Sequence, residues 1–125
     1  MKRLIEKAKQ ARAKAYAPYS KFKVGAAIET KDGRIFTGCN VENAAFGASC
    51  CAERVAIFKA ISEGKRSFKR IALVTNKREL TPPCGTCRQV LNEFSPKIEV
   101  VMANTRGKST IMMLADLLPR AFSEF

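Results

Sequence analysis

Two short segments of the sequence combine cysteines with residues that can support metal chemistry. Cys51 and Glu53 lie in the first segment, and Cys84 and Cys87 lie in the second. Cysteines three residues apart on the first turn of a helix face the same side, so Cys84 and Cys87 can bind one metal ion. Cys51 can supply a third thiolate, which leaves the fourth tetrahedral position open for water. The pattern therefore predicts a catalytic zinc site with three cysteine ligands.

Glu53 is predicted to move protons at that open position. It follows Cys51 by two residues, so its carboxylate can reach a water molecule on the metal without binding the metal itself. Zinc lowers the pKa of bound water to about 7 in good cases, and a nearby carboxylate can remove and return the proton. Three thiolates leave the site with a net negative charge. We expect Arg54 to offset it by donating hydrogen bonds to the ligand sulfurs.

The cysteines also allow two other interpretations. The pair Cys84 and Cys87 could be a redox pair, as in thioredoxin-like proteins, but this leaves Cys51 and Glu53 without a role. Alternatively, Cys50 or Cys39 could supply a fourth thiolate and close a purely structural zinc site. The agreement of Glu53 with both cysteine segments favours the catalytic interpretation.

The elements that must position these residues follow from hydrophobic spacing and turn signals. Helices are predicted where apolar residues recur every three or four positions, and strands where short apolar runs are bounded by turns. Lys31-Asp32-Gly33 between two strand-like runs indicates a hairpin. We expect helices over 2–15, 51–63, 84–94 and 113–118, and strands over 22–30, 34–40, 71–75, 98–102 and 109–113. Their order predicts an α/β fold, a three-layer α/β/α sandwich with a mixed five-stranded sheet.

Length and composition limit the class of protein. The 125 residues predict a single domain over 1–125, and 46% hydrophobic residues suffice for a core. An odd number of cysteines and no apolar run typical of an export signal or a membrane span favour a cytosolic protein with no membrane partner. The net charge of +12 suggests polyanion binding, but lysine and arginine are scattered along the chain. We therefore expect a solvated basic surface and no nucleic-acid partner.

The chain closely resembles the small, homotetrameric, zinc-dependent cytidine deaminases. The resemblance covers essentially the whole sequence and rests on residues 16–27, 38–44, 51–54, 83–89 and 117–122. It implies hydrolytic deamination of cytidine and 2'-deoxycytidine to uridine and 2'-deoxyuridine, with release of ammonia, as part of pyrimidine salvage. A zinc-bound hydroxide would attack the base, and Glu53 would shuttle the protons.

The resemblance also implies a role for individual positions. It assigns one zinc ion per chain to Cys51, Cys84 and Cys87, contact with the base to Phe22 and to the backbone of Ala52, and contact with the ribose to Asn40 and Glu42. It further implies a homotetramer with shared active sites, in which Phe46 and Phe122 contact the site of a neighbouring subunit. Cys39 and Cys50 receive no role.

Three other functions are compatible with the zinc segments, but other features of the sequence disfavour each of them. A blasticidin S deaminase would share the zinc segments, but residues 19–22 and 40–42 favour a nucleoside. A polynucleotide deaminase would need an open groove for the flanking nucleotides. A non-catalytic zinc protein would have no use for Glu53.

Overall fold

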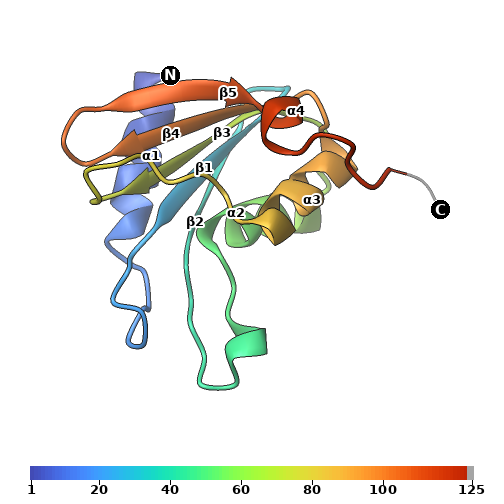
Figure 1. Cartoon of the computed structure of the whole chain (residues 1–125). Coiled ribbons are helices and arrows are strands. Elements are labelled where there is room, and N and C mark those ends of the chain that lie inside the picture. The colour runs from blue at the N-terminus through green and yellow to red at the C-terminus, as the bar shows by residue number, and fades with distance from the viewer. Residues whose placement is uncertain (124–125) are drawn as a thin grey trace.

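The chain folds into one five-stranded sheet between two layers of helices (Figure 1). A computed structural model describes residues 1–123. The helices are α1 (Lys2–Arg12), α2 (Ala52–Ser62), α3 (Gly85–Phe94) and α4 (Leu114–Leu117), with one 3-10 turn, η1 (Phe46–Ala48). The strands are β1 (Gly25–Thr30), β2 (Ile35–Cys39), β3 (Phe68–Thr75), β4 (Glu99–Asn104) and β5 (Ser109–Met113).

The sheet is mixed and has the order β2-β1-β3-β4-β5. Strands β3 and β4 run parallel, whereas the other neighbouring pairs run antiparallel. A parallel pair needs a crossover connection, and α3 provides it. The sequence-based prediction of an α/β fold with a mixed five-stranded sheet is therefore confirmed.

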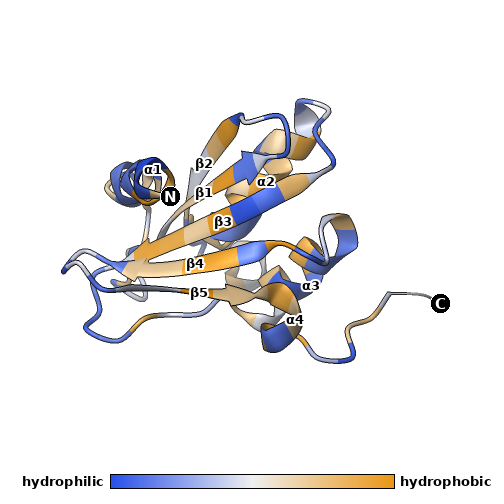
Figure 2. Cartoon of the chain, turned by 90° about the horizontal axis from the view of Figure 1, so that it is seen from above, coloured by the Kyte–Doolittle hydropathy of each residue, from blue (hydrophilic) through white to orange (hydrophobic). Residues whose placement is uncertain are grey.

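Residues of the central strands alternate between two hydrophobic clusters, one on each face of the sheet. In β4, Val100 and Met102 belong to the cluster that includes residues of α2 and α3, whereas Val101 and Ala103 belong to the cluster that includes residues of α1. This alternation is the period-2 pattern of a strand buried on both faces. Figure 2 accordingly shows α1 on one side of the sheet and α2 and α3 on the other.

Three strand ends meet at one edge of the sheet and define where a site can form. Gly25, the first residue of β1, pairs with Cys39 at the end of β2 and with Val74 near the end of β3. The connections that follow β2 and β3 lead to the N-termini of α2 and α3. The fold thus brings the segments around residues 22–24, 40–42, 51–53 and 75–84 together.

Two predicted boundaries on the N-terminal half are wrong by three residues. The first helix ends at Arg12 instead of residue 15, because the chain turns and the Tyr16 N–H donates to the Asn40 carbonyl (3.0 Å). The first strand begins at Gly25 instead of residue 22. The amide side chain of Asn40 there replaces a strand partner, accepting from the Val24 N–H (2.8 Å) and donating to the Phe22 carbonyl (2.8 Å).

The remaining elements lie within three residues of their predicted bounds. Gly33 has a φ of +91°, a backbone conformation that glycine adopts without steric cost, as the predicted hairpin turn requires. Residues 124–125, the end of the predicted domain 1–125, lie outside the described residues. Within the described part of the chain, no helix has the length and apolarity that crossing a membrane requires.

Candidate active site

The sulfur atoms of Cys51, Cys84 and Cys87 converge between the first turns of α2 and α3. They lie within 4.8 Å of one another, with 3.6 Å between Cys51 and Cys84 and 3.4 Å between Cys84 and Cys87. Cys51 and Cys84 are the N-cap residues of their helices, and both have an extended backbone. Because the two helices start at the same edge of the sheet, segments 33 residues apart contribute to one cluster.

The groups around Cys51 favour its thiolate form, whereas the hydrogen bond with Cys51 and burial raise the pKa of Cys87. Hydrogen bonds from Cys87 and from the Arg54 guanidinium lower the pKa of Cys51 to about 5, against the opposing effect of burial. The donor in Arg54 is Nη2, which lies 3.5 Å from the Cys51 sulfur. Arg54 therefore contacts the sulfur of one cysteine of the cluster and is not itself part of the metal-binding group.

The donor set fits zinc. Tetrahedral zinc with thiolate bonds of about 2.3 Å places its sulfurs about 3.8 Å apart, close to the distances observed here. Among the described residues, Cys51, Cys84 and Cys87 form the one group of three or more potential ligands, so neither Cys39 nor Cys50 joins as a fourth thiolate. Cys39 instead lines a separate hollow between α1 and α2. The arrangement leaves a coordination position for a further ligand.

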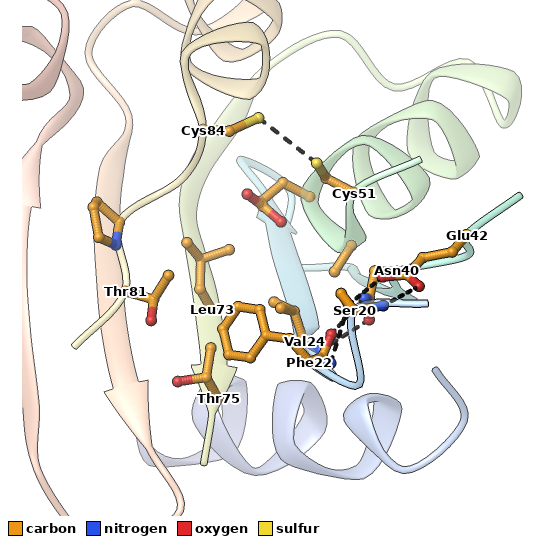
Figure 3. Close-up of a pocket in the computed structure, with 13 residues that line it drawn as sticks. Ser20, Phe22, Val24, Asn40, Glu42, Cys51, Leu73, Thr75, Thr81 and Cys84 are labelled. Atoms are coloured by element: carbon orange, nitrogen blue, oxygen red, sulfur yellow. Dashed lines mark hydrogen bonds between the residues drawn. The ribbon is translucent and has the colours of Figure 1, made fainter. Parts of the chain in front are cut away.

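Glu53 lines a cavity of about 300 Å³, which Figure 3 shows in close-up. Its side chain is only 5% exposed, and burial raises its pKa to about 7. Cys51 and Cys84 line the same cavity. A carboxyl group in such surroundings exchanges a proton readily near neutral pH.

Asn40 and Glu42 line the same cavity, and both are held in place by hydrogen bonds. The Asn40 amide binds the backbone of residues 22–24, as described above. One carboxylate oxygen of Glu42 accepts from the N–H groups of Tyr19 and Ser20 (3.0 Å each), and the other accepts from the Ser20 hydroxyl. The hydrogen bonds from Ser20 hold the pKa of Glu42 below its usual value. Glu42 is therefore ionised and oriented before any ligand binds.

Phe22 and Ala52 complete the predicted set of cavity residues. The ring of Phe22 forms part of the wall, and the Lys77 ammonium lies 4.5 Å from the centre of this ring. Ala52 is the first residue of α2, where the backbone N–H has no partner inside the helix. The structure thus brings Phe22, Asn40, Glu42, Ala52 and Glu53 together around one cavity.

Phe46 and Phe122 do not line this cavity. Phe46 is 74% exposed in η1 and packs edge-to-face on Tyr19, with 5.8 Å between the ring centres. Phe122 is 68% exposed, and its carbonyl accepts hydrogen bonds from Gln89 (2.7 Å) and Asn92 (3.2 Å). Phe46 instead lines a second hollow together with Tyr19, Ser20, Glu42 and Ser49.

Sequence reasoning missed several residues of the cavity wall. Those without a predicted role are Ser20, Val24, Leu73, Thr75, Thr81 and Pro82. A usable signal existed for Ser20, which lies within the segment that carries the resemblance. Leu73 belongs to a buried strand and resembles an ordinary core residue, so nothing in its local sequence distinguishes it.

Comparison with known proteins agrees with this geometry. The model of the cytidine and deoxycytidylate deaminase zinc-binding region matches residues 1–104. The chain belongs to this deaminase family. Among curated family members, the cytidine deaminase of Sporosarcina psychrophila is 48% identical and covers 99% of this chain and 92% of its own length. The cytidine deaminase of Mycobacterium tuberculosis is 43% identical over 92% of this chain and 84% of its own length.

Solved structures of the family share the fold as well. The crystal structure of cytidine deaminase from Burkholderia pseudomallei has a TM-score of 0.94 and 52% identity, covering 97% of this chain and 98% of that one. The cytidine deaminase structure from Mycobacterium tuberculosis has a TM-score of 0.84 and 40% identity, covering 98% and 97%. The predicted family and zinc-binding triad are confirmed by these matches and by the converging sulfurs.

Proposed function

We propose that this chain catalyses the hydrolytic deamination of cytidine and 2'-deoxycytidine to uridine and 2'-deoxyuridine, with release of ammonia. The observation that carries the proposal is one cavity lined by Glu53, by the zinc-binding Cys51 and Cys84, and by the residues Phe22, Asn40 and Glu42 (Figure 3). Its volume of about 300 Å³ suits a small molecule and excludes a folded polymer. Family members of similar length are cytidine deaminases, which supports the same substrate.

The base is positioned by Phe22 and Ala52 in this proposal. The Phe22 ring offers an apolar surface for the flat pyrimidine, and the Ala52 N–H donates to the carbonyl oxygen of the base. This orientation of the base directs its C4 atom toward Cys51 and Cys84, which line the same cavity.

The ribose is bound by Asn40 and Glu42. An ionised carboxylate accepts several hydrogen bonds, so Glu42 has capacity left for sugar hydroxyl groups beyond its three bonds to Tyr19 and Ser20. Because these bonds already fix both side chains, little conformational entropy is lost when the nucleoside binds.

Glu53 moves the protons of the reaction. Zinc held by Cys51, Cys84 and Cys87 would act as a Lewis acid that makes water a nucleophile at neutral pH. Glu53 accepts a proton from the attacking water and delivers it to N3 of the base. It then passes the second proton of that water to the amino group, which leaves as ammonia while the C4 carbonyl of uridine forms.

We also propose a cytosolic homotetramer with shared active sites. Phe46 and Phe122 are exposed and do not line the cavity of their own chain, so both rings are accessible to a neighbouring subunit, as the family resemblance implies. All five cysteines are free, which fits a reducing compartment.

A substrate panel tests the proposed substrate. The zinc-loaded protein is assayed with cytidine, deoxycytidine, cytidine monophosphate and blasticidin S, and ammonia is measured for each. The proposal predicts that the two nucleosides are turned over with the highest kcat/KM. Turnover of blasticidin S without turnover of cytidine would reassign the substrate while leaving the deaminase chemistry in place.

A further inference from the structure

The side chain of Arg88 connects two segments that meet beside the zinc-binding cysteines. Arg88 lies on α3, directly after Cys87. Its Nε donates to the carbonyl of Pro83 (2.7 Å), and its Nη1 donates to the carbonyl of Leu117 (2.6 Å), the last residue of α4. One planar guanidinium therefore binds the approach to Cys84 and the C-terminal part of the chain at the same time.

The hydrogen bond from Arg88 to Pro83 spans the segment that contains Cys84, at the N-cap of α3, and Cys87, in its first turn. Pro83 is buried and immediately precedes Cys84, whose extended backbone turns the chain into the helix. Proline has no N–H, so its carbonyl is the one backbone group by which the turn can be held at this residue. No side chain caps the N-terminus of α3. The Arg88 side chain thus restrains the turn that leads into Cys84, where no capping side chain does so.

Neighbouring residues on α3 bind the C-terminal segment without touching the turn at Pro83. Gln89 and Asn92 donate to the Phe122 carbonyl, and Figure 1 shows this C-terminal segment, in red, beside α3. Among the described residues, Arg88 is the side chain whose hydrogen bonds join both segments. The effect of Arg88 on the turn at Pro83 can therefore be separated by experiment from the binding of the C-terminal segment to α3, to which Gln89 and Asn92 also contribute.

We propose that Arg88 is a positioning residue for the zinc centre. By binding Pro83 and Leu117 together, it fixes Cys84 relative to Cys87 and makes zinc retention depend on the docking of α4. By linkage, zinc bound at the cysteines stabilises the docked C-terminal segment in return. The inference rests on the zinc centre alone and is independent of which nucleoside the cavity binds.

Chelator challenge tests the proposal with Arg88→Met, which keeps the aliphatic stem and removes the donors. Gln89→Met is the matched control, because it removes a bond to the C-terminal segment and leaves the turn at Pro83 intact. Zinc-loaded proteins are mixed with a chromogenic chelator, and the rate of zinc loss is followed. We expect loss about tenfold faster in Arg88→Met, the lower end of the effect of residues that orient metal ligands, and a rate near wild type in Gln89→Met.

Arg88→Lys and cobalt substitution separate positioning from general destabilisation. A lysine can bind one of the two carbonyls, so its rate of metal loss should lie between those of wild type and Arg88→Met. The cobalt–thiolate absorption should also shift in Arg88→Met and remain unchanged in Gln89→Met. A wild-type rate in Arg88→Met overturns the proposal, and so does equal acceleration in both methionine variants. If Arg88→Met does not fold, Arg88→Lys decides, and a wild-type rate there is the contrary result.

Discussion

Three residues at the start of α2 have different surroundings, and for this reason we propose a different role for each. Cys51 is at the helix N-cap with a lowered pKa, whereas Glu53 is buried and has a raised pKa. Arg54 contacts the Cys51 sulfur through Nη2. Residue types and spacing predicted the cysteine triad from the sequence, whereas the roles of Glu53 and Arg54 stay predictions. The partners of Glu42 lie 22 and 23 residues away, and Leu117, one of the two partners of Arg88, lies 29 residues away, so no local spacing rule finds them.

Replacement of Arg54 by alanine should weaken the zinc centre. The substitution removes one of the hydrogen bonds that lower the pKa of Cys51, so the thiolate becomes harder to form and the negative charge of the ligand set is no longer offset. We expect zinc affinity and turnover to fall by about 10- to 100-fold. Zinc per chain after dialysis and kcat check this, and wild-type values of both would remove the role given to Arg54.

Replacement of Glu42 by glutamine should impair binding more than chemistry. The amide keeps the shape of the side chain but loses the charge that strengthens hydrogen bonds to the ribose. Because the loss of a hydrogen bond to a charged group costs about 1.5–3 kcal/mol, we expect KM to rise about tenfold or more while kcat changes little. Steady-state kinetics with cytidine measure both values. A fall in kcat at constant KM would contradict a role in ribose binding.

At the scale of elements, the close approach of α2 to β2 determines where the first turn of α2 lies. A Cβ atom at Gly38 would lie 2.5 Å from the Ala52 carbonyl and 2.5 Å from the Ala56 N–H, so only glycine allows this contact. The sequence predicted both elements, but not this packing distance. Likewise, the sequence did not predict that the Asn40 side chain binds the backbone of Phe22 and Val24, so that β1 begins only at Gly25.

Gly38→Ala should therefore displace the helix that carries Cys51 and Glu53. We expect a loss of about 1–3 kcal/mol in stability, typical of overpacking, together with a clear fall in kcat. Gly25→Ala is the control, since its Cβ would meet the Ala8 carbonyl of α1 on the other face of the sheet. Thermal unfolding and kcat per folded molecule are compared. An equal loss of kcat in both variants would mean that the effect is general destabilisation.

At the scale of the whole molecule, fold and family follow from the sequence more completely than assembly does. The alternation of strands and helices predicted the layered sheet, and the two cysteine segments predicted the metal centre. Phe46 and Phe122 are different, because an exposed ring in one chain does not identify the surface that covers it. Their proposed role depends on a neighbouring subunit.

Light scattering tests the proposed assembly. We expect a particle four times the mass of the 13.8 kDa chain. If Phe122 contacts a neighbouring site, Phe122→Ala should raise KM for cytidine while the tetramer persists. A stable monomer with full activity would contradict the assembly and both aromatic roles.

The most direct test of the account compares the wild type with Glu53→Ala in the same assay. Ultraviolet absorbance follows cytidine, ammonia release is measured in parallel, and bound zinc is determined for both proteins. We predict that the wild type converts cytidine with equal release of ammonia, and that Glu53→Ala keeps its zinc but loses at least about 100-fold in kcat. A folded, fully metallated wild type without turnover, or a Glu53→Ala variant with wild-type turnover, would contradict the account.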